Sequence, residues 1–149
     1  MGQNHAFVMM IHDKWWLEFL RKDRQGLHIH SYVKTGAASP KEASLILFYV
    51  TKPVGELAGY AGFIERKVGE AEELWKQHGR ESALNSKQQY EEFVKDRRKV
   101  SFIRFKNLQE AVNPIPLKNV LMLLGGKRLS RKGFYVDKKT ADKLLAAME

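Results

Sequence analysis

The sequence predicts a single α+β domain over residues 1–149, with a barrel-like β core, and three observations lead to this prediction. Short runs of apolar, β-branched and aromatic residues recur along the chain, separated by segments with apolar residues at helical spacing. The length of 149 residues and the 44% hydrophobic content are enough for one packed core. Gly59 and Gly62 interrupt a strand-like run, as at the bends that close small barrels.

The N-terminal half predicts four strands and one helix. The strands are apolar, β-branched or aromatic runs bounded by turn residues, at 6–11, 27–34, 45–51 and 56–66. The run at 45–51 is the strongest, because it is almost entirely apolar and so indicates burial on both faces. The helix at 14–21 has Asp13 as its expected N-cap and Gly26 as its stop.

The C-terminal half predicts three helices and two strands. In order they are helix 69–78, helix 87–97, strand 100–106, a turn at Pro114 and Pro116 leading into 117–124, strand 134–136, and a final helix from Asp137 or Thr140. Ser86 is the expected cap of the second helix, and Tyr90, Phe93 and Val94 form its inward face.

Composition and motifs exclude several kinds of site. The chain has no cysteine, which excludes disulfides, thiolate metal sites and a cysteine nucleophile, and which fits a cytoplasmic protein. No apolar run approaches the roughly 20 residues of a membrane span, so no membrane partner is expected. No phosphate-binding glycine loop or nucleophile-elbow serine occurs. His28 and His30 share a strand face but lack a carboxylate at ligand spacing, so no metal or cofactor is predicted.

The net charge of +9 is concentrated in residues 95–139, which hold thirteen of the basic residues and three of the acidic ones. Such asymmetry favours a surface that meets a polyanion, most simply nucleic acid. The basic residues expected to contact it are Arg97, Arg98, Lys99, Arg104, Lys127, Arg128, Arg131 and Lys132. Residues 127–132 follow a double glycine on an expected loop, whereas 97–99 is equally explained as a solvated helix end.

The aromatic residues suggest a place for a base to stack. Trp15 and Trp16 are adjacent and cannot share one helical face, so one is expected in the core and the other is a candidate for a pocket wall or stacking platform. The alternative is that both pack in the core or that one is simply partly exposed. Tyr49 and Tyr135 are further candidates.

Three stretches together resemble the PUA-like domains, notably their EVE and ASCH branches. Residues 39–52 resemble the proline turn and leu-phe-tyr strand of these domains, 57–65 their glycine-containing strand, and 128–145 their closing arg-leu-ser segment, strand and helix. Residues 100–117 resemble the middle strand and proline turn of these domains. The chain as a whole most resembles an uncharacterised archaeal family of this superfamily.

The resemblance implies a PUA-like pseudo-barrel of five to six strands with peripheral helices. Members bind RNA or modified nucleotides, and some ASCH members hydrolyse modified nucleosides. Residues 30–36 lack the trp, arg and asn-rich segment of EVE domains, and Ser44 replaces the aspartate of their turn, so their base specificity does not transfer.

We therefore predict an RNA- or modified-nucleotide-binding module. Its expected pocket residues are Trp15, Ser31, Tyr32, Lys34, Thr35, Tyr49, Thr51, Lys52, Ser130 and Tyr135. One alternative is a hydrolase of a modified nucleoside, in which Lys34 or Lys52 acts as a base if burial lowers its pKa. Another is an interaction domain whose basic face meets an acidic protein. The sequence does not indicate an oligomeric state.

Overall fold

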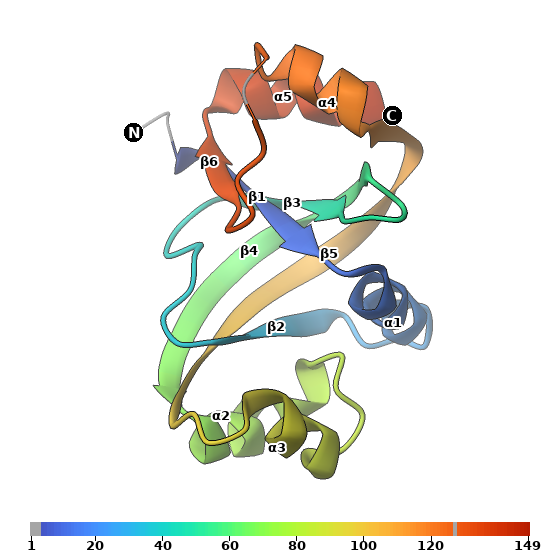
Figure 1. The fold of residues 1–149 in the computed structure, drawn as a ribbon. Coiled ribbons are helices and arrows are strands. Elements are labelled where there is room, and N and C mark those ends of the chain that lie inside the picture. The colour runs from blue at the N-terminus through green and yellow to red at the C-terminus, as the bar shows by residue number, and fades with distance from the viewer. Residues whose placement is uncertain (1–3, 127) are drawn as a thin grey trace.

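The computed structural model describes residues 4–126 and 128–149, and it has the α+β architecture that the sequence predicts (Figure 1). The strands form one sheet in the order β2-β5-β4-β3-β1-β6. They are β1 (Ala6–Ile11), β2 (Ile29–Thr35), β3 (Leu45–Val50), β4 (Glu56–Glu70), β5 (Lys99–Pro116) and β6 (Phe134–Val136). The helices are α1 (Asp13–Arg24), α2 (Ala71–His78), the 3₁₀ helix η2 (Gly79–Glu81), α3 (Lys87–Val94), α4 (Leu117–Leu123) and α5 (Lys138–Met148). Strands β1 and β3 are parallel, and the other neighbours are antiparallel.

The sheet curls into a pseudo-barrel because its two long strands bend. The pairing of β4 with β5 shifts register at Leu57/Gly59, Tyr60/Gly62 and Phe63/Glu65, and each such bulge adds local twist. The curl brings β2 face to face with β1, although three strands separate them in the sheet: Lys34 Nζ lies 6.0 Å from the centre of the Phe7 ring. The edge strands β2 and β6 therefore border an open seam in the barrel.

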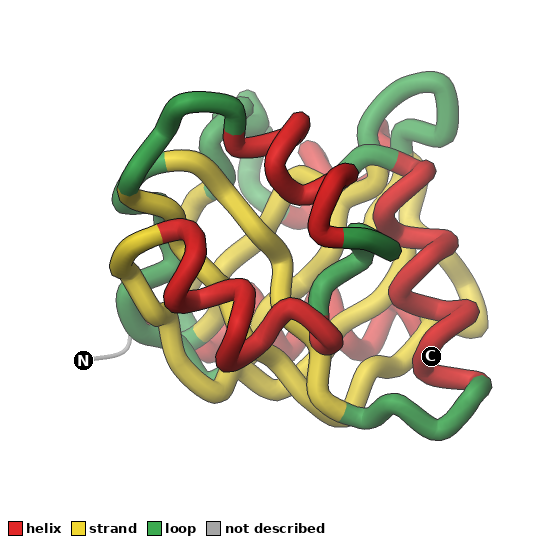
Figure 2. Tube along the Cα trace, turned by 90° about the horizontal axis from the view of Figure 1, so that it is seen from below, coloured by secondary structure: helices red, strands yellow, loops and turns green. Residues whose placement is uncertain are grey.

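Helices cover the barrel at three places, each over its own buried cluster (Figure 1). Helix α1 packs Phe19 against Phe105 inside the barrel, at 5.2 Å between ring centres. Helices α4 and α5 cover a second cluster above it, and α2 and α3 cover a third below it around Tyr90 and Phe102. The view from below shows the helices lying outside the curved strands (Figure 2). Within the described residues, no helix is both long and apolar enough to cross a bilayer.

Two of the predicted helix caps are confirmed, and one is wrong. Ser86 accepts a hydrogen bond from the Gln89 N–H at 3.1 Å, and Asp137 accepts one from the Thr140 N–H at 2.8 Å. At α1 the cap is His12 and not Asp13, since His12 Nδ1 accepts from the Lys14 N–H at 3.1 Å.

Two predicted boundaries are also wrong. The turn expected at Pro114 and Pro116 is the end of β5, which continues to residue 116. Prolines are tolerated there because the first residue of β2, Ile29, pairs with Lys106. Beyond Lys106 the outer side of β5 is therefore an edge without a ladder partner. Helix α3 ends at Val94 instead of 97, where Lys95 takes a positive φ of 52°.

Gly59 lies where the backbone of β4 passes closest to its neighbours. A Cβ at this position would lie 2.7 Å from Trp16 Cη2 and closer still to the backbone oxygen of Gln109. We expect Gly59→Ala to lower the free energy of unfolding by about 2 kcal/mol, because the overpacked strand must shift. Urea denaturation measures this.

Gly62→Ala is the matched control on the same strand. The nearest atom to a Cβ there is the Lys106 backbone oxygen at 3.6 Å, which is ordinary contact. We expect this variant to be close to the wild type, and equal losses in the two variants would contradict the close approach at Gly59.

Candidate nucleic-acid-binding cleft

A cleft of about 490 Å³ opens at the seam between β2 and β6. Strand β2 forms its floor with Tyr32, Lys34 and Thr35. The loop after β2 forms one wall at Ala37, Ala38 and Ser39, α3 contributes Phe93, and Lys132 reaches in from the segment before β6. Three of the residues predicted for a pocket and one predicted for phosphate contact thus lie together.

The most unusual group in the cleft is the Lys34 ammonium. Strand alternation places Tyr32 and Lys34 on the same face of β2, and Lys34 Nζ lies 5.6 Å from the Tyr32 ring centre and 6.0 Å from that of Phe7. Among the described residues, no carboxylate forms an ion pair with Lys34 and no group accepts a hydrogen bond from its Nζ.

This environment changes the protonation of Lys34. Burial lowers the pKa of Lys34 to about 8, because desolvation disfavours the charged amine. About a tenth of the amine is therefore neutral at pH 7. Burial also raises the pKa of Tyr32 to about 12, so its phenol stays protonated.

Aromatic rings line the cleft beside Lys34. Phe93 is 37% exposed and meets Trp15 edge to face, at 6.2 Å between ring centres. Both rings border a small hollow under Tyr32. Trp16 is buried against Phe48 in the core, whereas Trp15 borders the small hollow. The prediction that Phe93 points inward is wrong: Tyr90 and Val94 are the buried residues of α3, and Phe93 lies beside that face at the edge of the cleft, against Trp15.

Backbone contacts bring further cationic residues to the loop wall. The Gly36 N–H donates to the Lys99 carbonyl at 3.1 Å, and Arg66 Nη1 donates to the Ala38 carbonyl at 3.0 Å. Arg97 and Arg98 are exposed in the adjoining segment before β5. The wall opposite Lys132 is therefore bordered by the predicted basic residues 97–99 and by Arg66.

A second hollow, of about 600 Å³, lies on the other side of β6. Arg128, Ser130 and Tyr135 line it, with Asn4 and the start of α5. These three predicted residues therefore gather away from Tyr32 and Lys34. Tyr135 separates the two hollows: its ring meets Phe7 at 5.0 Å, and its hydroxyl accepts from the Lys41 N–H at 2.8 Å.

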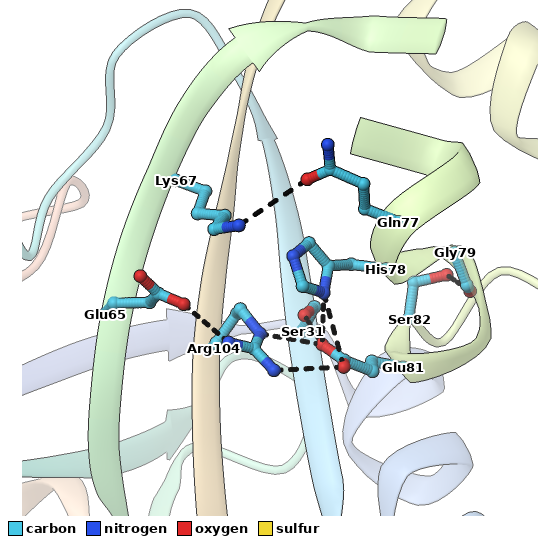
Figure 3. A network of polar contacts seen from close by, with 9 residues as sticks. All are labelled: Ser31, Glu65, Lys67, Gln77, His78, Gly79, Glu81, Ser82 and Arg104. Carbon is cyan, nitrogen blue, oxygen red and sulfur yellow. Dashed lines mark hydrogen bonds and ion pairs between the residues drawn. The ribbon is translucent and has the colours of Figure 1, made fainter. Parts of the chain in front are cut away.

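Arg104 and Ser31 do not lie in the cleft, contrary to the sequence-based expectation. Arg104 donates to Glu81 from Nε at 2.9 Å and from Nη2 at 3.1 Å, and to Glu65 from Nη1 at 2.5 Å (Figure 3). The Ser31 hydroxyl donates to Glu81 at 2.8 Å, and His78 Nδ1 lies 3.3 Å from the same carboxylate. This network links η2 to β2, β4 and β5 through hydrogen bonds. The Arg104 guanidinium donates its hydrogen bonds to Glu81 and Glu65, inside the protein.

The network also fixes the charge of Glu81. Burial alone would raise the pKa of Glu81, but hydrogen bonds from Arg104 and Ser31 lower it below its ordinary value. The carboxylate therefore stays ionised at neutral pH and holds Arg104 in place.

Tyr49, Thr51 and Lys52 lie at the other end of the barrel. The Thr51 N–H donates to the Ile11 carbonyl at the C-terminal end of β1, whereas Ala6 at its start pairs with β6. Phe7, which lies beside Lys34, is four residues from Ile11 on β1, or about 13 Å along the strand. Arg131 is exposed on the turn before β6. Lys127 lies outside the described residues.

The fold has close counterparts among solved structures. The ASCH protein from Zymomonas mobilis superposes with a TM-score of 0.75 at 22% identity, over 97% of this chain and 96% of that one. A variant of it with a serine replaced by alanine gives 0.79 at 19% identity over the whole of both chains. A variant with a tyrosine replaced by phenylalanine gives 0.75 at 21%, over 97% and 99%.

No family model matches the sequence, and no curated protein matches it either. At these identities the likeness concerns the fold, and it confirms the resemblance at that level. The chain has the PUA-like fold of the ASCH domain.

Proposed function

We propose that this protein binds RNA or a modified nucleotide in the cleft at the seam of the barrel. The observation that carries the proposal is the Lys34 ammonium, which is half-buried against aromatic rings in an open cleft and has no carboxylate partner among the described residues. Such a cation is stabilised by an anion that enters from outside.

A nucleotide supplies both groups that the cleft can bind. Its phosphate meets Lys34 and Lys132, and its flat base can pack against Tyr32 or Phe93. A nucleotide carries its anion and its flat ring in one unit, whereas an acidic protein segment needs separate residues for the two, so the aromatic lining favours a nucleotide. The exposed Arg97 and Arg98 provide further positive charge beside the loop wall for a longer strand.

The test is binding of a labelled single-stranded oligoribonucleotide, followed by fluorescence anisotropy as the salt concentration rises. We expect affinity to fall with salt. In the double variant Lys34→Gln with Lys132→Gln, we expect weaker binding and a salt slope smaller by about 1.4, since two phosphate contacts are lost.

The double variant Lys76→Gln with Lys87→Gln is the control for net charge. These lysines border a different hollow beside Trp75 and form exposed ion pairs with Glu73 and Glu72. Binding should survive in this variant. Absence of binding at low salt, or an equal loss in both variants, would rule the proposed cleft out.

The lowered pKa of Lys34 also supports the second candidate, hydrolysis of a modified nucleoside with Lys34 as the base. Lys52 is exposed at the far end of the barrel and does not share this environment. Incubation with a panel of modified nucleosides, read by mass change, tests this candidate. No turnover by the wild type, or turnover that Lys34→Gln leaves intact, would exclude Lys34 as the base.

A further inference from the structure

The Lys34 amine has the surroundings of a nucleophile as well as those of a binding group. It lies in an open cleft, so a ligand atom can reach it, and the Tyr32 and Phe7 rings beside it accept no proton. At pH 7 its neutral fraction is about 300-fold larger than that of a lysine with the ordinary pKa of 10.5. A neutral amine adds to carbonyl carbon, whereas an ammonium does not.

Lys22 and Lys132 differ from Lys34 in how accessible the amine is from the cleft and in how far it is buried. Burial also lowers the pKa of Lys22, but its Nζ donates to the Ser82 carbonyl at 2.6 Å and lies outside the cleft. Lys132 borders the cleft but is exposed. Lys34 alone among these three combines access from the cleft with an amine that no protein group holds.

We propose that Lys34 forms an imine with the aldehyde of an abasic nucleotide held in the cleft, an inference that rests on the proposed nucleic-acid binding. A nucleotide that has lost its base exposes an aldehyde carbon when its sugar ring opens. Its flanking phosphate can meet Lys132, and the neighbouring base can pack on Phe93 or Tyr32. The missing base leaves room for the sugar to approach the floor of the cleft.

The reaction balances without any further reagent. The Lys34 nitrogen forms a bond to the aldehyde carbon, and the carbonyl oxygen leaves as water with the two amine hydrogens. The product is an imine, and its protonated form is a cation that the faces of the Tyr32 and Phe7 rings stabilise. Strand cleavage is not part of the proposal.

The experiment uses the full chain and an oligoribonucleotide that carries one abasic deoxyribose. Sodium borohydride reduces an imine to a stable secondary amine, and peptide mass spectrometry then locates it. We expect a covalent adduct on Lys34 in the wild type. The same oligonucleotide with a tetrahydrofuran in place of the sugar has no aldehyde, and we expect it to give no adduct.

Lys34→Arg keeps the positive charge but removes the nucleophile. We expect it to lose at least about 90% of the adduct when both proteins are compared at an oligonucleotide concentration that saturates their binding. A second measurement uses the wild type alone and so does not depend on the folding of a variant. Formaldehyde with cyanoborohydride at pH 7 should methylate Lys34 faster than Lys22 or Lys132.

The outcomes separate the two proposals. If the intact oligonucleotide does not bind, the proposed function fails and this inference fails with it. If it binds but the adducts spread evenly over the surface lysines, or persist in Lys34→Arg, only the imine proposal is overturned. Methylation of Lys34 at the rate of the exposed Lys132 would also overturn it.

Discussion

Replacing Arg104 with methionine is expected to lower the free energy of unfolding by about 3 kcal/mol or more. The Arg104 side chain is 14% exposed and the Glu81 side chain 17% exposed, so removal of the guanidinium leaves Glu81 ionised with little access to water. Breaking a buried ion pair by removing one partner costs about 3–5 kcal/mol. Denaturant unfolding monitored by circular dichroism measures the loss.

The network also predicts where the damage should appear. Ser31 bonds to Glu81 and lies one residue before Tyr32 on β2, and the backbone of Ser31 bridges to Ser82. Amide hydrogen exchange should therefore rise first in β2 and in residues 79–84. Oligonucleotide affinity should fall as well, because β2 carries the floor of the cleft.

Lys138→Met is the matched control for this prediction. It also removes one cation from an ion pair, with Asp142 at 2.8 Å, but both side chains are more than half exposed. Such surface pairs contribute less than about 1 kcal/mol. If Arg104→Met and Lys138→Met are equally stable, the network of Figure 3 does not fasten β2.

Arg104 also shows what a sequence can and cannot predict for this protein. Local signals predict the local structure well: Ser86 and Asp137 cap their helices because a cap needs only a side chain and a nearby N–H. The partners of Arg104 are 23 and 39 residues away, and they meet it only through the register of β4 with β5 and the position of η2. From charge alone, Arg104 is indistinguishable from a residue that binds phosphate.

The candidate site also has a part that the sequence predicts and a part that depends on long-range pairing. Tyr32, Lys34 and Thr35 lie together because they are neighbours on one strand. The sequence contains no sign that Tyr49 and Lys52 lie at the far end, since this depends on the parallel pairing of β1 with β3. Helical spacing puts Phe93 next to Tyr90 and Val94, but it does not show that the buried face of α3 stops short of Phe93, whose ring lies at the cleft.

Replacing Lys34 with methionine is expected to stabilise the protein at pH 7, by about 3 kcal/mol. Burial lowers the pKa of Lys34 from 10.5 to about 8 in the folded state, and each unit corresponds to about 1.4 kcal/mol. Below pH 8 both states carry the charge, and the folded state bears the whole desolvation penalty. A methionine of similar length removes that penalty.

The stability difference between Lys34→Met and the wild type should depend on pH. Between pH 8 and 10.5 the unfolded chain holds the Lys34 proton while the folded chain has released it, so the wild type gains stability as pH rises. The advantage of Lys34→Met should therefore shrink through this window and vanish above it. Urea denaturation of both proteins at pH 6, 7, 9 and 10 measures it. Lys132→Met is the control for the loss of a lysine at the same cleft, because Lys132 is exposed.

Stability and binding should thus move in opposite directions at this one residue. An anionic ligand in the cleft compensates the buried ammonium, so oligonucleotide binding should raise the pKa of Lys34, and binding should weaken as pH rises through about 8. A Lys34→Met protein that is less stable at pH 7, or that still binds with the affinity of the wild type, would show that the charge of Lys34 is not held for a ligand. A Lys34→Met protein that is more stable but binds the oligonucleotide more weakly would show that the cost of burying this amine in the folded state is kept for ligand binding.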